Sequence, residues 1–143
     1  MSLPEPASAT PSAPTAPSEL RVLVVEADPE SLQMMGALLS LWGYDPRLAA
    51  DGVVGLAAVE RERPDVVLLD LGLPGIDGFE VARRLRGMPG GESILIVAVT
   101  AYRGEEHRRQ AREAGFDKYL MKPVDIETLR LVLAQTPRQT ATG

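Results

Sequence analysis

The chain has 143 residues, which is enough for one domain with a full hydrophobic core. Its formal net charge of −5 argues against direct nucleic-acid binding, because nucleic-acid-binding domains are normally basic. The sequence has no cysteine, which excludes disulfides and thiolate metal sites, and no apolar run approaches the roughly 18 residues of a membrane span. We therefore expect a cytoplasmic protein without membrane insertion.

Residues 1–18 differ in composition from the rest of the chain. Prolines are spaced among Ala, Ser and Thr, and large apolar side chains are almost absent. Such a segment cannot bury enough apolar surface to offset the entropy of ordering it, so we predict a disordered linker. Residues 19–136 are predicted to form the folded domain, and residues 137–143 a flexible polar tail.

The first half of the domain alternates between strand and helix signals. An apolar run from Leu20 to Val25 predicts a strand, and Asp28 followed by Pro29 is a typical helix start. Apolar residues then recur at helical spacing as far as Gly43. The next elements are a strand at Pro46–Ala50 and a helix from Asp51 to about Arg63.

The second half begins with the four apolar residues Val66–Leu69, which predict a strand buried on both faces. This strand ends at Asp70, and Gly and Pro residues follow at once. The remaining predicted elements are helices at Gly78–Arg86 and Gly104–Ala114, strands at Ile94–Val99 and Lys118–Met121, and a last helix capped by Asp125.

A strand is followed by a helix five times, and the strands are nearly continuous in apolar residues. This pattern predicts a single doubly wound α/β domain, with a five-stranded parallel sheet and helices on both faces. Right-handed crossovers leave few topologies, of which the strand order 2-1-3-4-5 is the one we expect.

Polar side chains follow four of the predicted strands, at the edge where parallel strands end together. They are Glu26 with Asp28, Asp70, Thr100 and Lys122. Neighbouring carboxylates repel unless a cation lies between them, and an all-oxygen cluster suits Mg²⁺. A hydroxyl and an ammonium across the same crevice stabilise a tetrahedral anion, and a carboxylate is a competent nucleophile. The set predicts an aspartyl-phosphate site.

With these residues in view, the chain resembles a response-regulator receiver domain of two-component signalling, over residues 20 to 136. The receivers of hybrid sensor histidine kinases are the most similar subfamily. The resemblance rests on four segments in order: Val24-Val25-Glu26-Ala27-Asp28-Pro29, Leu69 to Gly78, Val99-Thr100-Ala101-Tyr102, and Tyr119 to Asp125. It implies a flavodoxin-like fold and a regulatory phosphoacceptor domain rather than an enzyme, although a parent chain that is itself a kinase stays open.

The resemblance also assigns roles to single residues. Asp70 would accept a phosphoryl group from a sensor histidine kinase or phosphotransfer protein, and Lys122 would pair with that group. Glu26, Asp70 and the Gly72 carbonyl would hold Mg²⁺, with Asp28 as a further candidate ligand. The remaining implied features are Thr100 as the switch hydroxyl, Tyr119 as the rotating aromatic residue, a cis bond between Lys122 and Pro123, and a weak homodimer through the last helices.

One departure leaves a second function open. Members of this family usually carry two adjacent acids after the first strand, and the second is a direct metal ligand, but Ala27 occupies that position here. We expect reduced Mg²⁺ affinity, because a side chain without oxygen cannot replace a carboxylate. The alternative is a pseudo-receiver, an interaction module in which metal binding and phosphorylation are impaired.

Two other classes on the same fold are disfavoured. A phosphatase of the Asp-x-Asp type needs an acid two residues after its nucleophile, where this chain has Gly72. A flavodoxin needs a hydroxyl-rich phosphate loop after its first strand, whereas Glu26 and Asp28 would repel phosphate there.

Overall fold

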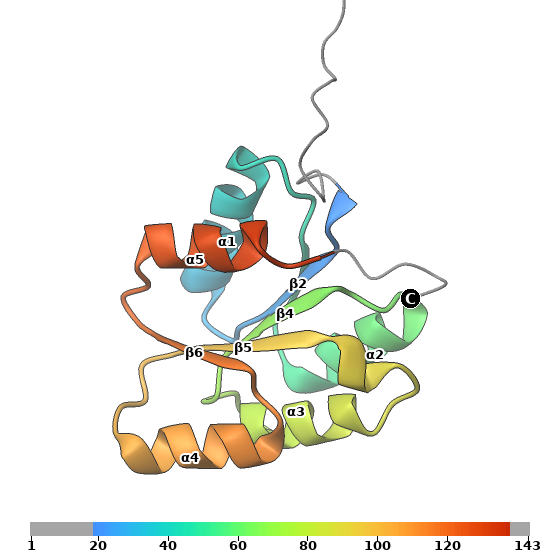
Figure 1. The fold of residues 1–143 in the computed structure, drawn as a ribbon, viewed down its shortest axis with the longest axis vertical. Helices are drawn as coiled ribbons and strands as arrows, with labels where there is room; N and C mark the ends of the chain where they lie inside the picture. Colours follow the sequence, from blue (N-terminus) through green and yellow to red (C-terminus); the bar gives the residue numbers. More distant parts are fainter. Residues whose placement is uncertain (1–18, 138–143) are drawn as a thin grey trace, which may run out of the picture.

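The computed structural model describes residues 19–137, so the predicted linker at residues 1–18 and all but the first residue of the predicted tail lie outside the described residues. The described part is one parallel five-stranded sheet with helices on both faces (Figure 1). The strands are β2 (Val22–Val25), β3 (Arg47–Ala49), β4 (Val66–Leu69), β5 (Leu95–Thr100) and β6 (Lys118–Met121). The helices are α1 (Pro29–Leu41), α2 (Gly52–Arg61), α3 (Gly78–Arg86), the 3₁₀ turn η2 (Gly91–Ser93), α4 (Glu105–Ala114) and α5 (Ile126–Ala134).

The strand order is β3-β2-β4-β5-β6, which confirms the predicted order 2-1-3-4-5 counted along the chain. Every pair is parallel, and the central strand β4 pairs with β2 on one side and β5 on the other. All four residues of β2 and of β4 are buried, as expected for strands covered on both faces. The carboxyl ends of the strands therefore lie at one edge of the sheet, where open α/β sheets bind their ligands.

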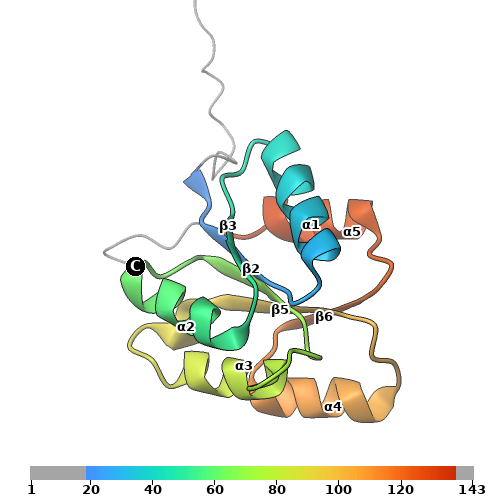
Figure 2. The same cartoon turned by 180° about the vertical axis from the view of Figure 1, so that it is seen from behind.

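Two apolar layers hold the helices to the sheet. Helices α2, α3 and α4 pack on one face through a cluster that includes Val59, Val81 and Ala111. Helices α1 and α5 cover the other face through a cluster that includes Leu39 and Leu129 (Figures 1 and 2). Alternate strand residues supply the two layers, which is why the strands read as continuous apolar runs.

Aspartates cap four of the helices as their sequences require. Asp28, Asp51, Asp77 and Asp125 each accept a hydrogen bond from a backbone N–H in the first turn. The bounds of some elements differ by one or two residues from those expected, while those of β4, α3 and β6 agree. β2 begins at Val22 rather than Leu20, because the Arg21 carbonyl accepts from the amides of Asp65 and Val66 before the strand starts.

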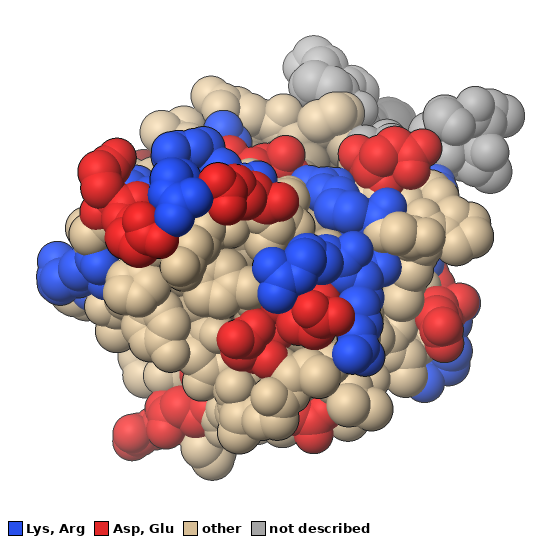
Figure 3. Space-filling view, turned by 90° about the horizontal axis from the view of Figure 1, so that it is seen from below, with Lys and Arg blue, Asp and Glu red and all other residues tan. Residues whose placement is uncertain are grey.

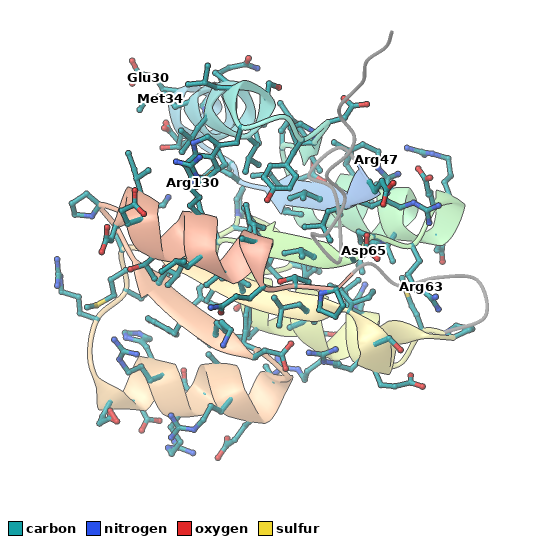
Figure 4. All side chains as sticks on the ribbon, turned by 45° about the horizontal axis from the view of Figure 1, so that its top comes forward. Glu30, Met34, Arg47, Arg63, Asp65 and Arg130 are labelled. Carbon is teal, nitrogen blue, oxygen red and sulfur yellow. The ribbon has the colours of Figure 1, made fainter. Side chains whose placement is uncertain are left out.

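The end of the sheet opposite the strand carboxyl termini is closed by polar contacts. Asp65 is 1% exposed, and its Oδ2 accepts from the Arg21 amide at 2.7 Å. Figure 4 shows Asp65, Arg47 and Arg63 at this end, far from Met34 and Glu30 on α1.

Arg130 extends from α5, and its guanidinium lies 5.6 Å from the ring centroid of Trp42 at the end of α1. These contacts fix the elements around the sheet and leave the other end open for a site.

The face formed by α3 and α4 carries charges of both signs (Figure 3). Glu80 pairs with Arg83 and Arg84 on α3, and Arg109 pairs with Glu106 and Glu113 on α4. This face therefore lacks the continuous basic surface that is typical of nucleic-acid binding. Within residues 19–137, none of the helices has the length and apolar character needed to cross a bilayer.

Candidate functional site: a carboxylate and ammonium pocket at the sheet edge

Backbone hydrogen bonds bring three charged residues to the carboxyl edge of the sheet. The Glu26 amide donates to the carbonyl of Ala49, the last residue of β3, and the Asp70 amide donates to the carbonyl of Val25, the last residue of β2. The Lys122 amide donates to the Thr100 carbonyl at 2.8 Å. Each residue is thus fixed by the strand next to its own, so the side chains converge without depending on loop conformation.

The centre of the site is the ammonium of Lys122 between two carboxylates. Lys122 Nζ lies 2.6 Å from Glu26 Oε1 and 3.4 Å from Asp70 Oδ2. The side chains of Glu26, Asp70 and Lys122 are 9%, 15% and 28% exposed, so these charges meet in a partly dehydrated pocket. The peptide bond between Lys122 and Pro123 is cis.

The same contacts perturb the lysine. Burial alone would lower the pKa of the Lys122 ammonium, because it disfavours the charged form. The hydrogen bond to Glu26 and the charges of Asp70 and Glu26 outweigh that effect, so the pKa of Lys122 is raised above its ordinary value. Lys122 is therefore a permanent cation of this pocket at neutral pH.

Both carboxylate oxygens of Asp70 have a partner. Oδ1 accepts from the Gly72 amide at 3.2 Å, while Oδ2 faces Lys122. The loop that follows is closed by the Gly78 amide, which donates to the Leu71 carbonyl at 2.9 Å. Position 78 has no room for a side chain, since a Cβ there would lie 2.2 Å from the Asp70 carbonyl oxygen.

The residues predicted around a metal are only partly brought together. Asp28 is used as the N-cap of α1, with Oδ2 accepting from the Ser31 amide at 2.9 Å, and this bond lowers the pKa of its carboxyl group. Ala27 packs against the apolar core and supplies no side-chain oxygen. In residues 19–137 no three His, Cys, Asp or Glu side chains are grouped around a common point. The oxygens at the edge of the sheet are those of Glu26, Asp70 and the Gly72 backbone.

Thr100 and Tyr119 lie on the side of the site formed by β5 and β6. Thr100 is fully buried, and its Oγ1 accepts from the Tyr102 amide at 3.2 Å. The Tyr119 hydroxyl donates to the Tyr102 carbonyl at 2.8 Å, and the Arg108 guanidinium lies 4.7 Å from the Tyr119 ring centroid. Burial raises the pKa of Tyr119, with Arg108 opposing the shift. The two predicted switch residues, Thr100 and Tyr119, therefore both form hydrogen bonds with the backbone of Tyr102.

Sequence reasoning missed two features of the site. The first is Tyr102, whose ring crosses the loop after Asp70, so that its hydroxyl would lie 3.0 Å from a Cβ at Gly72. The second is an apolar cavity of about 470 Å³ between α1 and α5 that reaches Glu26, Asp70 and Lys122. Met34 and Ile126 line it and are 69% and 52% exposed. Met34, near the middle of α1, points outward (Figure 4), whereas Leu32, Gly36 and Leu39 of the same helix are buried. An apolar residue outside the buried stripe was the signal that the sequence offered.

Comparison with known proteins identifies the family of the chain. The sequence profile of the response regulator receiver domain matches residues 22–134. An uncharacterised 14.6 kDa protein of Leptolyngbya boryana is 38% identical over 116 residues, which are 80% of this chain and 88% of that protein. Response regulator PleD of Caulobacter vibrioides is 38% identical over 133 residues, but the chain spans only 29% of its length.

A solved structure extends the comparison to the fold. The receiver domain of sensor histidine kinase PA1611 from Pseudomonas aeruginosa, with a magnesium ion coordinated in its active-site cleft, superposes with a TM-score of 0.76. It is 32% identical, and the match covers 82% of this chain and 96% of that domain.

Proposed function

Because the chain belongs to the family of response regulator receiver domains, we propose that Asp70 accepts a phosphoryl group from the phosphohistidine of a sensor histidine kinase or phosphotransfer protein. The observation that carries this proposal is the setting of the Asp70 carboxylate. One oxygen is held by the Gly72 amide, and the other lies 3.4 Å from the Lys122 ammonium. A carboxylate oriented in this way is a suitable nucleophile, and the adjacent cation offsets the charge of the incoming phosphoryl group.

Magnesium is the cofactor that this oxygen set suits. Asp70, Glu26 and the Gly72 carbonyl are the groups that would hold it, since Mg²⁺ prefers oxygen ligands. When bound, the ion neutralises charge on the transferring phosphoryl group. The affinity is reduced in this chain, because Ala27 provides no carboxylate and Asp28 is engaged as a helix cap.

Two hydrogen bonds provide a switch that follows phosphorylation. Thr100 Oγ1, which accepts from the Tyr102 amide, moves away to donate its own O–H to a phosphoryl oxygen on Asp70, and the loss of the amide contact loosens the backbone at Tyr102. Since the same residue holds the Tyr119 hydroxyl, Tyr119 becomes free to turn inward. Phosphorylation thereby shifts the population between two arrangements of the surface formed by α4, β6 and α5.

The cavity between α1 and α5 supplies the approach for the donor protein. Met34 and Ile126 are exposed apolar side chains at a charged site, which is typical of interaction surfaces. We place the domain in the cytoplasm, acting on a partner or on the remainder of a parent chain, of which a hybrid sensor kinase is one form. A weak homodimer through the last helices is a further part of this proposal.

The alternative function is a pseudo-receiver that works through protein contacts alone. It is favoured by Ala27, which leaves the pocket without the second of the two adjacent acids, and by the Glu26–Lys122 ion pair, in which the lysine already has a partner. Such a domain would retain the apolar cavity and the α1–α5 surface while lacking a chemical input.

Beryllofluoride, a mimic of the phosphoryl group, distinguishes the two functions. We expect its addition with Mg²⁺ to shift the backbone NMR signals of Asp70, Thr100 and Tyr119 in the wild type, and to leave the Asp70→Asn variant unchanged. An unchanged wild-type spectrum at millimolar or higher Mg²⁺ would refute the phosphoacceptor proposal and support the pseudo-receiver.

A further inference from the structure

We propose that His107 is a positioning residue of the switch, which holds the loop between β5 and α4 (residues 101–104) in the arrangement that precedes phosphorylation. The inference rests on the proposed function, because it concerns the regulation of the same phosphoacceptor site. His107 acts through Tyr102, the residue whose backbone forms hydrogen bonds with both Thr100 and Tyr119.

The imidazole of His107 reaches from the first turn of α4 back to the loop that precedes the helix. Its Nδ1 lies 2.7 Å from the Arg103 carbonyl oxygen. Because a carbonyl oxygen only accepts, Nδ1 carries a proton and donates it to Arg103. The ring centroid of His107 lies 4.8 Å from that of Tyr102, a separation at which aromatic rings attract each other. One side chain therefore holds two consecutive residues of the loop.

The bond to Arg103 is not part of the helix. The backbone hydrogen bonds of α4 begin with the Arg108 amide, which donates to the Gly104 carbonyl at 3.2 Å. Gly104 is the N-cap of α4 and has no side chain that could accept from the first-turn amides. Since Arg103 precedes this cap, the imidazole of His107 links the body of α4 to a residue outside the helix.

Tyr102 connects this link to the phosphoacceptor site. Its amide donates to Thr100 Oγ1 at 3.2 Å, and its carbonyl accepts from the Tyr119 hydroxyl at 2.8 Å. Its own hydroxyl lies against the phosphoacceptor loop, since it would be 3.0 Å from a Cβ at Gly72. When Thr100 moves and Tyr119 turns inward, both backbone contacts of Tyr102 are lost. The contacts of His107 then remain as the restraint that opposes displacement of the loop.

Burial contributes little to holding this loop in place. Residues 101–106 are all exposed, and Tyr102 is 40% exposed, whereas His107 is half-buried. A segment with few buried apolar contacts is held mainly by its individual hydrogen bonds and ring contacts. A single side chain can therefore change the balance between the two arrangements of the loop.

Removal of the imidazole should release the loop. A net hydrogen bond of ordinary strength changes an equilibrium about fivefold, and a ligand of the switched state binds more tightly by the same factor when that state becomes more populated. At saturating Mg²⁺, we expect His107→Ala to bind beryllofluoride about fivefold more tightly than the wild type, as measured from the backbone NMR signals of Thr100 and Tyr119. Gln110→Ala is the matched control and should bind with the wild-type affinity, because Gln110 is exposed on the same helix and its side chain donates to Glu106 within that helix.

Two conservative variants identify the group that acts. The side-chain amide nitrogen of Asn lies as many bonds from Cα as Nδ1 of His, so His107→Asn keeps the donor without the ring and should retain close to the wild-type affinity. His107→Phe keeps a ring without a donor and should bind beryllofluoride as tightly as His107→Ala. Tighter binding by His107→Asn as well would refute the role of the bond to Arg103.

A further measurement needs no phosphoryl mimic. The chain has one histidine, so ¹⁵N-labelled histidine gives a single imidazole in the NMR spectrum. At alkaline pH, we expect the proton of the neutral ring on Nδ1, and a mixture of the two tautomers once beryllofluoride is bound. In His107→Ala, the ring signals of Tyr119 should shift even without beryllofluoride.

The inference is overturned if the neutral ring carries its proton on Nε2 before beryllofluoride is added, or if His107→Ala leaves the Tyr119 ring signals unchanged. A wild type that binds beryllofluoride with the same affinity as His107→Ala would refute only the positioning role of His107. A wild type that does not bind beryllofluoride, combined with a proton on Nδ1 and shifted Tyr119 signals in His107→Ala, would refute only the phosphoacceptor function.

Discussion

Ala27→Asp restores a carboxylate at the position where the family usually has its second acid. Ala27 is half-buried two residues after β2, next to Glu26, and packs against the core. We expect an aspartate at this position to turn its carboxylate toward Glu26 and Asp70 rather than bury it in the core. The pocket would then hold three carboxylates and one ammonium, instead of the two carboxylates that Glu26 and Asp70 provide now. We expect this variant to bind Mg²⁺ more tightly.

The magnitude follows from the charges in the pocket. Two unit charges 4 Å apart interact by about 4 kcal/mol at the effective dielectric of a protein surface, and a divalent ion doubles this figure. Desolvation of the new carboxylate offsets several kcal/mol of the gain. A net tightening of about 10- to 100-fold remains, which is the range found when groups that support a metal are removed. At saturating Mg²⁺, a 100-fold lower dissociation constant adds about 2.7 kcal/mol to the free energy of unfolding.

Calorimetric titration gives the dissociation constant, and thermal unfolding with and without Mg²⁺ gives the linked stability. Without the ion, Ala27→Asp should be less stable than the wild type, because three carboxylates repel one another. Ala57→Asp on the exposed side of α2 is the matched control and should leave the Mg²⁺ affinity unchanged. If Ala27→Asp binds Mg²⁺ no better than the wild type, the assignment of the pocket is wrong.

Three further variants test separate parts of the structure. Asp28→Ala should lower the stability at pH 7 and leave the Mg²⁺ affinity unchanged, because the Asp28 carboxylate caps α1. The folded-state pKa of Asp28 lies below its ordinary value of 3.8, so the full stability difference between wild type and variant should be present above pH 3.8. The difference should disappear as the pH falls through the folded-state pKa. A change in Mg²⁺ affinity would instead make Asp28 a ligand. Gly78→Ala should lower the free energy of unfolding in urea by about 3 kcal/mol or more, because the new Cβ would overlap the backbone at Asp70. Gly75→Ala should lower it by about 1 kcal/mol, because position 75 has open space but a φ of +76°. Equal losses for the two variants would contradict the overlap at position 78. Arg86→Lys should lower the free energy of unfolding by about 3 kcal/mol in the same assay, because one ammonium cannot replace the several donors of the guanidinium. That guanidinium donates to the carbonyls of Gly115, Gly91 and Ile94 and to the Asp117 carboxylate. A loss below about 1 kcal/mol would show that these hydrogen bonds contribute little to stability.

Local signals in the sequence were sufficient to predict most of the fold. Asp28 before Pro29 and Asp125 before Ile126 mark helix starts because a short carboxylate can accept from the first-turn amides, and both caps are present. The predicted helix at Gly78–Arg86 and strand at Val66–Leu69 have the observed bounds. The predicted end of the second helix near Arg63 was wrong by two residues, because Glu62 is already extended ahead of Pro64.

The site was predictable only as far as strand ends fix it. The order of the parallel strands brings Glu26, Asp70 and Lys122 to one edge, and a run of apolar residues before each of them was a sufficient signal. Which carboxylate holds Lys122 depends on side-chain reach across three strands, and this information is absent from any local pattern. The contacts of Tyr102 with Gly72 and Tyr119 likewise join three separate loops and strands, so no single motif indicates them.

The most direct test of the phosphoacceptor function is the intact mass of the protein after incubation with acetyl phosphate and Mg²⁺. We predict that the wild type gains the mass of one phosphoryl group, that peptide mapping places it on Asp70, and that Asp70→Asn gains none. A wild type without added mass at saturating Mg²⁺, or an Asp70→Asn variant labelled to the same extent, would contradict it.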